Sequence, residues 1–329
     1  MLKRPQNPQV CLKCRPLNHR RCPMPPEALA TLHAHLLGAL KNPPAETRRL
    51  FHGRGRCWPG LEQITVDWLQ GVVLVSLFKE TDALEPLKHT LMSLDWAACG
   101  AHTVALQHRY LPQSTTEWLL GDGVDELTIT EGGLRYLVDL GKKQNSGLFL
   151  DMRYGRNWVR EQARGLRVLN LFAYTCGFSV AAIEGGAEHV VNLDMARGAL
   201  SRGRDNHRLN GHDLGKVTFL GHDLFKSWAK VTGNGPYDLV IIDPPSFQKG
   251  SFVLTKDYQR VLRRLPELLT ARGTVLACMN DPAFCEDFLI DGVTREAPGL
   301  RFEQRLENPP EFPDTDPQSG LKALVFRQG

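Results

Sequence analysis

The 329-residue sequence has no apolar segment long enough to cross a membrane, and it has no recognisable secretory signal. Its longest clean apolar run is about the length of GVVLVSLF, residues 71–78, which is roughly a third of a membrane span. Its basic start, MLKRPQNPQVC, is followed by no apolar core. We also find no internal repeats. We therefore expect no membrane association, and a cytoplasmic enzyme or binding protein is favoured.

A disulfide framework is equally unexpected, although the chain has eight cysteines. Without an export signal, the thiols are expected to stay reduced. One local cluster has the spacing C-x2-C-x4-H-x2-C and consists of Cys11, Cys14, His19 and Cys22. This spacing approaches a zinc knuckle, in which the last gap is usually longer. Neighbouring prolines argue against an ordered loop, so incidental cysteines are the favoured interpretation and no metal site is predicted.

Acidic residues are scarce near the start of the chain. Residues 1–60 contain eleven Lys and Arg residues but only two acidic ones, Glu27 and Glu46. The rest of the chain has a small excess of negative charge. A basic arm on a mildly acidic body suggests a partner that carries phosphates, although charge alone fits a solvated tail equally well.

The apolar pattern divides the chain into three parts. Residues 1–47 hold the basic arm and one amphipathic helix over 26–41. Residues 48–147 alternate as strands do, with a short helix over 84–94, and predict a small α+β domain. In residues 148–329 strands and helices alternate, which predicts a doubly wound α/β domain. One long helix is expected within 256–270, with Pro266 placed to kink it.

Acidic residues follow three successive strands of the predicted parallel sheet. Asp194 ends NLD, Asp223 lies in GHDLF, and Asp243 ends the buried strand YDLVIID. Because ligands bind across the carboxyl ends of parallel strands, we expect the three carboxylates to share one edge. Asp194 lies where an acid accepts hydrogen bonds from ribose hydroxyls. Asp223 is placed to accept from an adenine amino group, although it could equally cap a helix.

The loop after the first of these strands, FAYTCGFS, lacks the G-x-G-x-x-G pattern of dinucleotide-binding proteins. It has only Gly177, which disfavours a cofactor with a pyrophosphate. A ribose, an adenine and no phosphate describe S-adenosylmethionine. The rigid Pro244 and Pro245 would then face the transferring methyl, and Phe247 would offer a flat face on which a nucleobase can stack.

Four segments together resemble the motifs of class I S-adenosylmethionine-dependent methyltransferases that act on bases of large-subunit (23S) ribosomal RNA. They are LNLFAYTCGFSVAAIEGGA, NLDMARGAL, GHDLF and IIDPPSF. PGLEQITVDW, QNSGLFLDMRYGR and FPDTDPQSGLKALVFR extend the resemblance over roughly residues 48–329. It implies a mostly parallel, Rossmann-like sheet with an antiparallel last strand, S-adenosylmethionine as cofactor, ribosomal RNA as partner, and a possible homodimer.

The same resemblance implies the site residues. The implied cofactor-binding residues are Asp151, Arg153, Phe172, Ala173, Tyr174, Thr175, Gly177, Asp194, Met195, Asp223, Leu224 and Asp243. The implied catalytic residues, which face the substrate base, are Asp243, Pro244, Pro245, Phe247 and Asn280.

Two features depart from that family. Many members begin with an RNA-binding PUA domain, whereas about 47 residues precede the matching region here, so the basic arm is the expected substitute. Members that methylate carbon-5 of cytosine carry a nucleophilic cysteine after the fifth strand, and Asn280 stands at that position here.

Three hypotheses follow. The favoured one is methylation of guanine N7 or another ring nitrogen, with Asn280 hydrogen-bonding the base. The second is methylation of cytosine carbon-5, with Cys278 or Cys285 as nucleophile. The third is an RNA-binding protein whose cofactor pocket has decayed, and its best support is Cys176 beside Gly177. The basic arm disfavours a small-molecule or protein substrate.

Overall fold

The structure is a computed structural model that describes residues 22–141, 145–245, 247–248 and 252–329. The basic arm predicted over the first residues therefore lies largely outside the described residues. So do Cys11, Cys14 and His19 of the cysteine cluster, and the side chain of Phe247. Within the described residues, no group of three or more His, Cys, Asp or Glu side chains is arranged to hold a metal ion.

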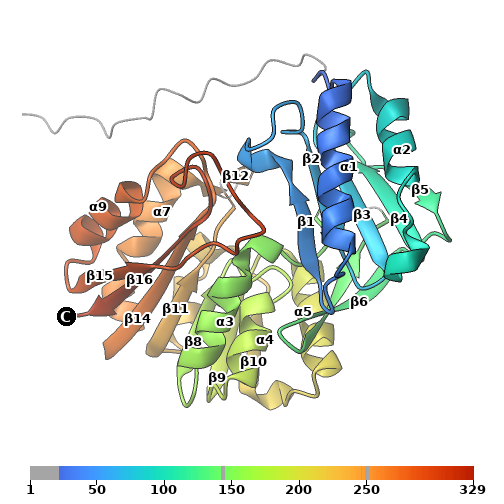
Figure 1. The fold of residues 1–329 in the computed structure, drawn as a ribbon. Coiled ribbons are helices and arrows are strands. Elements are labelled where there is room, and N and C mark those ends of the chain that lie inside the picture. The colour runs from blue at the N-terminus through green and yellow to red at the C-terminus, as the bar shows by residue number, and fades with distance from the viewer. Residues whose placement is uncertain (1–21, 142–144, 246, 249–251) are drawn as a thin grey trace, which may run out of the picture.

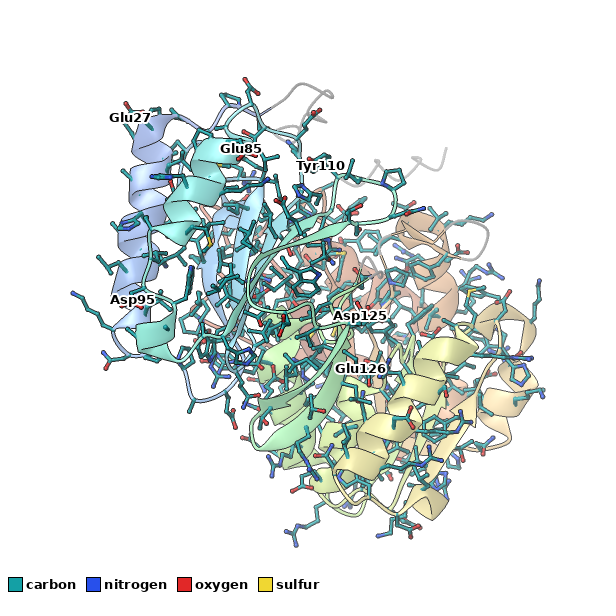
Figure 2. The ribbon with its side chains drawn as sticks, turned by 90° about the vertical axis from the view of Figure 1, so that its right-hand side faces the viewer. Glu27, Glu85, Asp95, Tyr110, Asp125 and Glu126 are labelled. Atoms are coloured by element: carbon teal, nitrogen blue, oxygen red, sulfur yellow. The ribbon has the colours of Figure 1, made fainter. Side chains whose placement is uncertain are left out.

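The amino-terminal half forms a five-stranded sheet in the order β1-β2-β3-β4-β5, with two helices beside it (Figure 1). The strands are β1 (Arg48–His52), β2 (Ile64–Trp68), β3 (Val72–Leu77), β4 (Thr103–His108) and β5 (Thr116–Leu120). The helices are α1 (Pro26–Leu40) and α2 (Leu84–Met92), as predicted to within two residues. β3 and β4 are parallel because α2 forms the crossover between them. Figure 2 shows Glu27 and Glu85 at the same end of the two helices, in their first turns, where negative charge complements the helix dipole.

The two faces of this sheet differ in character, because successive side chains of a strand point to opposite sides. The face under α1 and α2 is apolar and includes Val66, Val75 and Leu106. The alternate residues near the carboxyl end of β3 are polar and buried: Thr65, Asp67, Ser76 and Gln107. Buried polar side chains need partners, so this part of the second face differs from ordinary core, whereas Leu74 and Ala105 of the same face belong to an apolar cluster.

The carboxy-terminal half forms a seven-stranded sheet in the order β10-β9-β8-β11-β14-β16-β15. Its strands are β8 (Arg167–Leu171), β9 (His189–Leu193), β10 (Val217–Leu220), β11 (Tyr237–Ile242), β14 (Leu269–Met279), β15 (Leu300–Arg305) and β16 (Lys322–Gln328). β16 is antiparallel to both neighbours, and the other neighbouring pairs are parallel. The predicted Rossmann-like sheet with an antiparallel last strand is confirmed. A two-stranded ribbon, β12 (Phe247–Gln248) and β13 (Phe252–Val253), follows β11.

Helices cover both faces of the large sheet. They are α3 (Arg153–Gln162), α4 (Gly177–Glu184), α5 (Arg197–Leu209), α6 (Trp228–Thr232), α7 (Leu254–Leu262), α8 (Leu265–Leu268) and α9 (Asp287–Glu296). α3 and α4 pack on one face, and α6 to α9 pack on the other. The single long helix predicted within 256–270 was wrong. Pro266 stands in the first turn of α8, where its missing N–H is not needed, and β14 already begins at Leu269.

A hairpin of β6 (Glu126–Glu131) and β7 (Leu134–Asp139) joins the two halves. Its apolar side chains, such as Tyr136, share one cluster with Leu74 of the small sheet and Val180 of α4. Asn206 of α5 accepts a hydrogen bond from the backbone N–H of Leu137 at 2.8 Å. The hairpin therefore packs on both halves and does not belong to one of them alone. The domain boundary near residue 147 stays a prediction. In the described ranges no helix is both long and apolar enough to span a bilayer.

Candidate cofactor and substrate site

A cavity of about 530 Å³ opens at the carboxyl edge of the parallel strands β8 to β11. This volume is typical of sites for small organic ligands. The structure brings most of the predicted site residues to its wall. They are Asp151, Phe172, Ala173, Tyr174, Thr175, Gly177, Asp194, Met195, Asp223, Leu224, Asp243, Pro244, Pro245 and Asn280. We call this space the cofactor cavity.

The loop after β8 adopts left-handed backbone conformations at residues other than glycine. Phe172, Tyr174 and Cys176 all have positive φ, at 59°, 48° and 63°, a region that side chains other than glycine rarely adopt. Such strain persists only where neighbours hold it. Here Asp194 accepts from the N–H of Tyr174 at 2.8 Å, and Asn206 donates to the carbonyl of Thr175 at 2.9 Å. The loop is therefore fixed in a shape that leaves the cavity open.

Cys176 is packed beneath this loop, away from the cavity. It is fully buried, and its Sγ lies against Gly203 of α5, where an added Cβ would come within 2.4 Å of the sulfur. Burial raises the pKa of this thiol far above its ordinary range. Cys176 is thus a small apolar filler between the loop and α5, and it does not obstruct the cavity.

Asp194 follows β9 and has both of its oxygens in use. Oδ2 accepts from Tyr174, and Oδ1 accepts from the N–H of Ala196 at 2.7 Å. Burial raises its pKa, whereas these two backbone hydrogen bonds favour the ionised form. Each carboxylate oxygen has a second lone pair, so Asp194 keeps acceptor capacity for ligand hydroxyls.

Asp223, after β10, serves as a cap as well as a wall residue. Its Oδ1 accepts from the N–H of Phe225 at 2.9 Å at the start of the short 3-10 turn Leu224–Lys226. Its Oδ2 lies 3.6 Å from Nζ of Lys226. The cap that the sequence offered as an alternative is therefore present, and it fixes the carboxylate at the cavity wall.

Two further carboxylates, Asp243 and Asp151, meet on the far side of the cavity. Burial, reinforced by repulsion from Asp151, raises the pKa of Asp243 to about 7. Burial likewise raises the pKa of Asp151, although the nearby Arg49 and Arg156 oppose this. Nδ2 of Asn280 donates to Oδ2 of Asp151 at 3.2 Å. The residue after β14 is thereby tied to the segment before α3.

Among the predicted residues whose side chains the structure describes, Arg153 does not line the cofactor cavity. Its guanidinium donates to both carboxylate oxygens of Glu311 at 2.7 Å, which holds it against the carboxy-terminal loop. Arg156, one turn further along α3, lines the cavity instead. Arg156 is buried, and its Nε and Nη2 donate to the two carboxylate oxygens of Glu131 in β6 at 2.7 and 2.8 Å. The sequence signal for Arg156 was Glu131, which ends the alternating segment ELTITE on the side of its apolar residues. A carboxylate buried on that side needs a cationic partner.

Sequence reasoning also missed several aromatic wall residues. Phe149 is 48% exposed and packs on Tyr174, with ring centroids 5.7 Å apart. Phe178, Phe225 and His222 complete this part of the wall. Phe149 and Phe178 lie within the quoted segments QNSGLFLDMRYGR and LNLFAYTCGFSVAAIEGGA, but only their proximity in space identifies them as wall residues.

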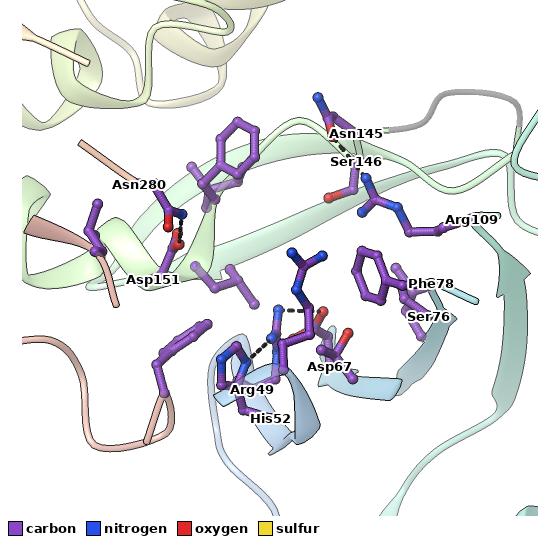
Figure 3. Close-up of a pocket in the computed structure, with 18 of the residues that line it drawn as sticks. Arg49, His52, Asp67, Ser76, Phe78, Arg109, Asn145, Ser146, Asp151 and Asn280 are labelled. Carbon is purple, nitrogen blue, oxygen red and sulfur yellow. Dashed lines mark hydrogen bonds and ion pairs between the residues drawn. The ribbon is translucent and has the colours of Figure 1, made fainter. Parts of the chain in front are cut away.

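A second cavity, of about 750 Å³, adjoins the first (Figure 3). It lies between the polar face of the small sheet and the segment that leads into α3. The two cavities share wall residues: Asn145, Gly147, Leu148, Phe149, Asp151, Asn280 and Leu321. Figure 3 shows Asn280 and Asp151 across the second cavity from Phe78 and Arg109. We call this space the inter-sheet cavity.

The sequence profile of the S-adenosylmethionine-dependent methyltransferases matches residues 48–327, which is most of the chain. The chain belongs to this family. Its cofactor cavity suits the family's cofactor, because three acids at successive strand ends face a space of small-ligand size without a phosphate-binding glycine turn.

The curated relatives are named as methyltransferases of large-subunit ribosomal RNA. The YwbD protein of Bacillus subtilis, assigned as a ribosomal RNA large subunit methyltransferase, is 30% identical over 249 residues, which cover 72% of this chain and 61% of the relative. The ribosomal RNA large subunit methyltransferase I of Aeromonas salmonicida is 33% identical over 53% of this chain and 44% of the relative. The chain thus spans roughly half to three fifths of these relatives' lengths.

The fold has a solved counterpart. SMU.776, assigned as a methyltransferase and crystallised in complex with SAH, superposes with a TM-score of 0.80. The match covers 90% of this chain and 81% of that one, at 24% identity. Because the likeness spans both halves, the small sheet and the large sheet occur together in that structure as well.

Proposed function

We propose that this protein transfers a methyl group from S-adenosylmethionine to a ring nitrogen of a base in large-subunit ribosomal RNA, with guanine N7 as the preferred target. The single observation that carries the proposal is the convergence of Asp194, Asp223 and Asp243 on one cavity next to a second, polar cavity. The names of the curated relatives support the choice of ribosomal RNA. Homodimer formation stays a prediction.

Different residues of the cofactor cavity would bind different parts of S-adenosylmethionine. When bound, S-adenosylmethionine supplies an electrophilic methyl group on a sulfonium. Asp194 would accept hydrogen bonds from the ribose hydroxyls, and Asp223 would accept from the adenine amino group. Pro244 and Pro245 hold the backbone after Asp243 in one conformation, so positioning rather than acid–base chemistry accounts for most of the catalysis.

The preference for nitrogen over cytosine carbon-5 rests on the positions of two cysteines. Methylation of carbon-5 needs a thiolate to attack carbon-6. Cys278 is fully buried within β14, and burial together with nearby Asp243 raises the pKa of its thiol well above its ordinary range. Cys285 lines neither cavity. Asn280 lines both cavities and carries an amide that can orient a base without covalent attack.

A decayed cofactor pocket is the less favoured alternative. Its main support was Cys176 beside Gly177, and the side chain of Cys176 packs against α5 instead of filling the cavity. A volume of about 530 Å³ leaves room for an adenosyl group.

Mapping of ribosomal RNA tests the proposal. We expect a strain without the gene to lack one base methylation in its large-subunit RNA, found by mass spectrometry of nuclease fragments. Complementation with Cys278→Ser or Cys285→Ser should restore the mark fully, because neither thiol takes part. Complementation with Asn280→Ala should restore it only partly. Loss of the mark with either serine variant would replace the nitrogen target by carbon-5, and an unchanged methylation pattern in the deletion strain would refute the substrate.

The raised pKa of Asp243 predicts a pH dependence that differs between cofactor and product. If Asp243 faces the sulfonium of bound S-adenosylmethionine, its carboxylate would stabilise that positive charge, so binding would favour loss of the Asp243 proton. Affinity for S-adenosylmethionine should therefore rise as the pH increases toward about 7 and level off above that value. We expect a gain of up to about tenfold, equivalent to one pKa unit of coupling.

Calorimetry across this pH range would measure the effect, with S-adenosylhomocysteine as the control because it carries no sulfonium. Its affinity should stay nearly constant. Asp243→Asn should flatten the curve for S-adenosylmethionine. Parallel curves for the two ligands in the unaltered protein would show that Asp243 does not face the sulfonium.

A further inference from the structure

The inter-sheet cavity has a wall built to hold a polar ligand. Thr65, Asp67, Ser76 and Gln107 face it from β2, β3 and β4, and all four are buried. They alternate with apolar residues that pack under α1 and α2. Leu74 and Ala105 lie on the same face and pack with the hairpin β6–β7, so the buried polar side chains are confined to the part of the face that borders the cavity. The polar face indicates a ligand with hydrogen-bonding groups.

Two arginines flank one aromatic ring at the mouth of this polar face. The guanidinium of Arg54 lies 4.3 Å from the ring centroid of Phe78, and that of Arg109 lies 4.9 Å from it. Phe78 follows β3 and Arg109 follows β4, and these neighbouring strands are parallel. Their carboxyl ends therefore deliver both residues to the same edge of the small sheet, as Figure 3 shows for these two side chains. Both guanidiniums thus lie within cation–π distance of the same ring.

The backbone of Arg54 is fixed by close packing on both sides. It lies in the 3-10 turn Gly53–Gly55. A Cβ on Gly53 would come within 1.8 Å of the carbonyl oxygen of Leu61, and one on Gly55 within 1.7 Å of that of Pro313. Only glycine fits at either position, so the turn is wedged between two segments and presents Arg54 to the cavity.

The charges of the cavity do not balance. Four arginines line it, Arg49, Arg54, Arg56 and Arg109, against three aspartates, Asp67, Asp151 and Asp314. Arg49 pairs with Asp67 at 2.5 Å, and Arg56 pairs with Asp314 at 3.1 Å. Among the described residues, no carboxylate lies within salt-bridge distance of Arg54 or Arg109.

Two further observations show that this clustering of buried positive charge is energetically unfavourable. Burial and repulsion from Arg49 lower the pKa of Arg54, and burial and repulsion from Arg54 lower that of Arg109. In the described part of the chain, the buried Nε of Arg109 has no hydrogen-bond partner, although its Nη2 donates to Asn145 at 3.0 Å. Positively charged side chains that repel one another in this way are expected where an anion binds.

We infer that Arg54 and Arg109, stacked on Phe78, bind a backbone phosphate of the RNA strand that carries the target base. This inference rests on the proposed function, because it assigns the inter-sheet cavity to the strand and the cofactor cavity to the methyl donor. The shared wall at Asp151 and Asn280 is where the base would pass toward the methyl group. A free nucleotide offers the same phosphate chemistry, so the test must separate the two sources.

The test measures RNA binding by the full chain in the presence of saturating S-adenosylhomocysteine. The probe is a fluorescent, single-stranded RNA of mixed sequence, about ten nucleotides long. Arg54→Ala and Arg109→Ala should each weaken its binding about tenfold, which corresponds to one charge-assisted contact. Each should also reduce the slope of log affinity against log salt by about 0.7, the value for one phosphate of a single strand. Arg109→Lys should recover part of the affinity, since it keeps the charge but loses the stacked, forked geometry.

Arg208→Ala is the matched control. Arg208 is an exposed arginine of α5 that pairs with Asp205 at 2.9 Å and lines neither cavity, so its removal should leave the affinity and the salt slope unchanged. The affinity of each variant for S-adenosylhomocysteine reports whether it is folded. It also separates the two proposals, because an unaltered protein that does not bind S-adenosylhomocysteine refutes the proposed function itself.

Two outcomes would overturn the inference. One is an unchanged RNA affinity and salt slope in Arg54→Ala and Arg109→Ala with product binding intact. The other is competition by guanosine 5′-monophosphate or inorganic phosphate at concentrations as low as those at which unlabelled RNA competes, which would assign the arginines to a free phosphate compound.

Discussion

Replacing Asp194 with alanine should weaken the binding of S-adenosylhomocysteine about 100-fold. The variant loses the acceptor for the ribose hydroxyls. It also loses the two hydrogen bonds, to Tyr174 at 2.8 Å and to Ala196 at 2.7 Å, that hold the strained loop after β8. Hydrogen bonds to a charged group contribute about 1.5–3 kcal/mol each, so the loss of one ligand contact and a looser loop together reach this size. Isothermal calorimetry would measure it.

Two variants sharpen this experiment. Asp194→Asn keeps one acceptor oxygen and should lose roughly tenfold, between the parent and the alanine variant. Asp213→Ala is the control, because Asp213 accepts from the N–H of Gly215, two residues further on, at 2.8 Å, as Asp194 does from Ala196, but it lines neither cavity. Its affinity for the product should stay unchanged. Equal losses in Asp194→Ala and Asp213→Ala would mean that turn stability, and not ligand contact, sets the affinity.

Replacing Glu131 with alanine should lower the free energy of unfolding by about 3–5 kcal/mol, the usual cost of removing one partner of a buried ion pair. Arg156 is 4% exposed and Glu131 is 3% exposed, so the variant leaves a guanidinium in the interior without its carboxylate. The pair also holds the hairpin β6–β7 against α3. Urea denaturation followed by circular dichroism would measure the loss.

The matched control is the exposed pair of Asp205 and Arg208, with side chains 44% and 62% exposed. Asp205→Ala should cost less than about 1 kcal/mol, because solvent screens a surface pair. Glu131→Met combined with Arg156→Met should recover much of the stability lost in Glu131→Ala, since no charge then remains buried. A cost below about 1 kcal/mol for Glu131→Ala would show that water reaches Arg156 through the cavity.

The large sheet and its site were predictable because local rules govern them. Parallel strands show as apolar runs, and their carboxyl ends share an edge, so the sequence alone could assign Asp194, Asp223 and Asp243 to one rim. Even here the prediction placed a single helix where Pro266 begins a new one. A sequence shows that a proline interrupts a helix, but neighbouring elements decide whether the chain bends or stops.

The rest of the site depends on contacts between distant segments. The left-handed conformations of Phe172 and Tyr174 cannot be predicted from residue types that normally avoid them, and the hydrogen bond from Tyr174 to Asp194 that helps to hold the loop joins two strand ends. The resemblance implied Arg153, whereas the positions of Glu311 and Glu131 hold Arg153 away from the cavity and bring Arg156 to it. The inter-sheet cavity was missed entirely, because its wall combines polar residues of the small sheet with a loop near the carboxyl terminus.

The common wall of the two cavities has a consequence for inhibitor chemistry. A compound that joins an adenosine to a phosphorylated nucleoside by a short linker could pass the boundary formed by Asp151 and Asn280 and occupy both spaces at once. Once one end has bound, the other end is present at a high effective concentration, so the whole binds more tightly than either fragment. The adenosine would supply affinity common to many methyltransferases, and the phosphate against Arg54 and Arg109 would supply selectivity.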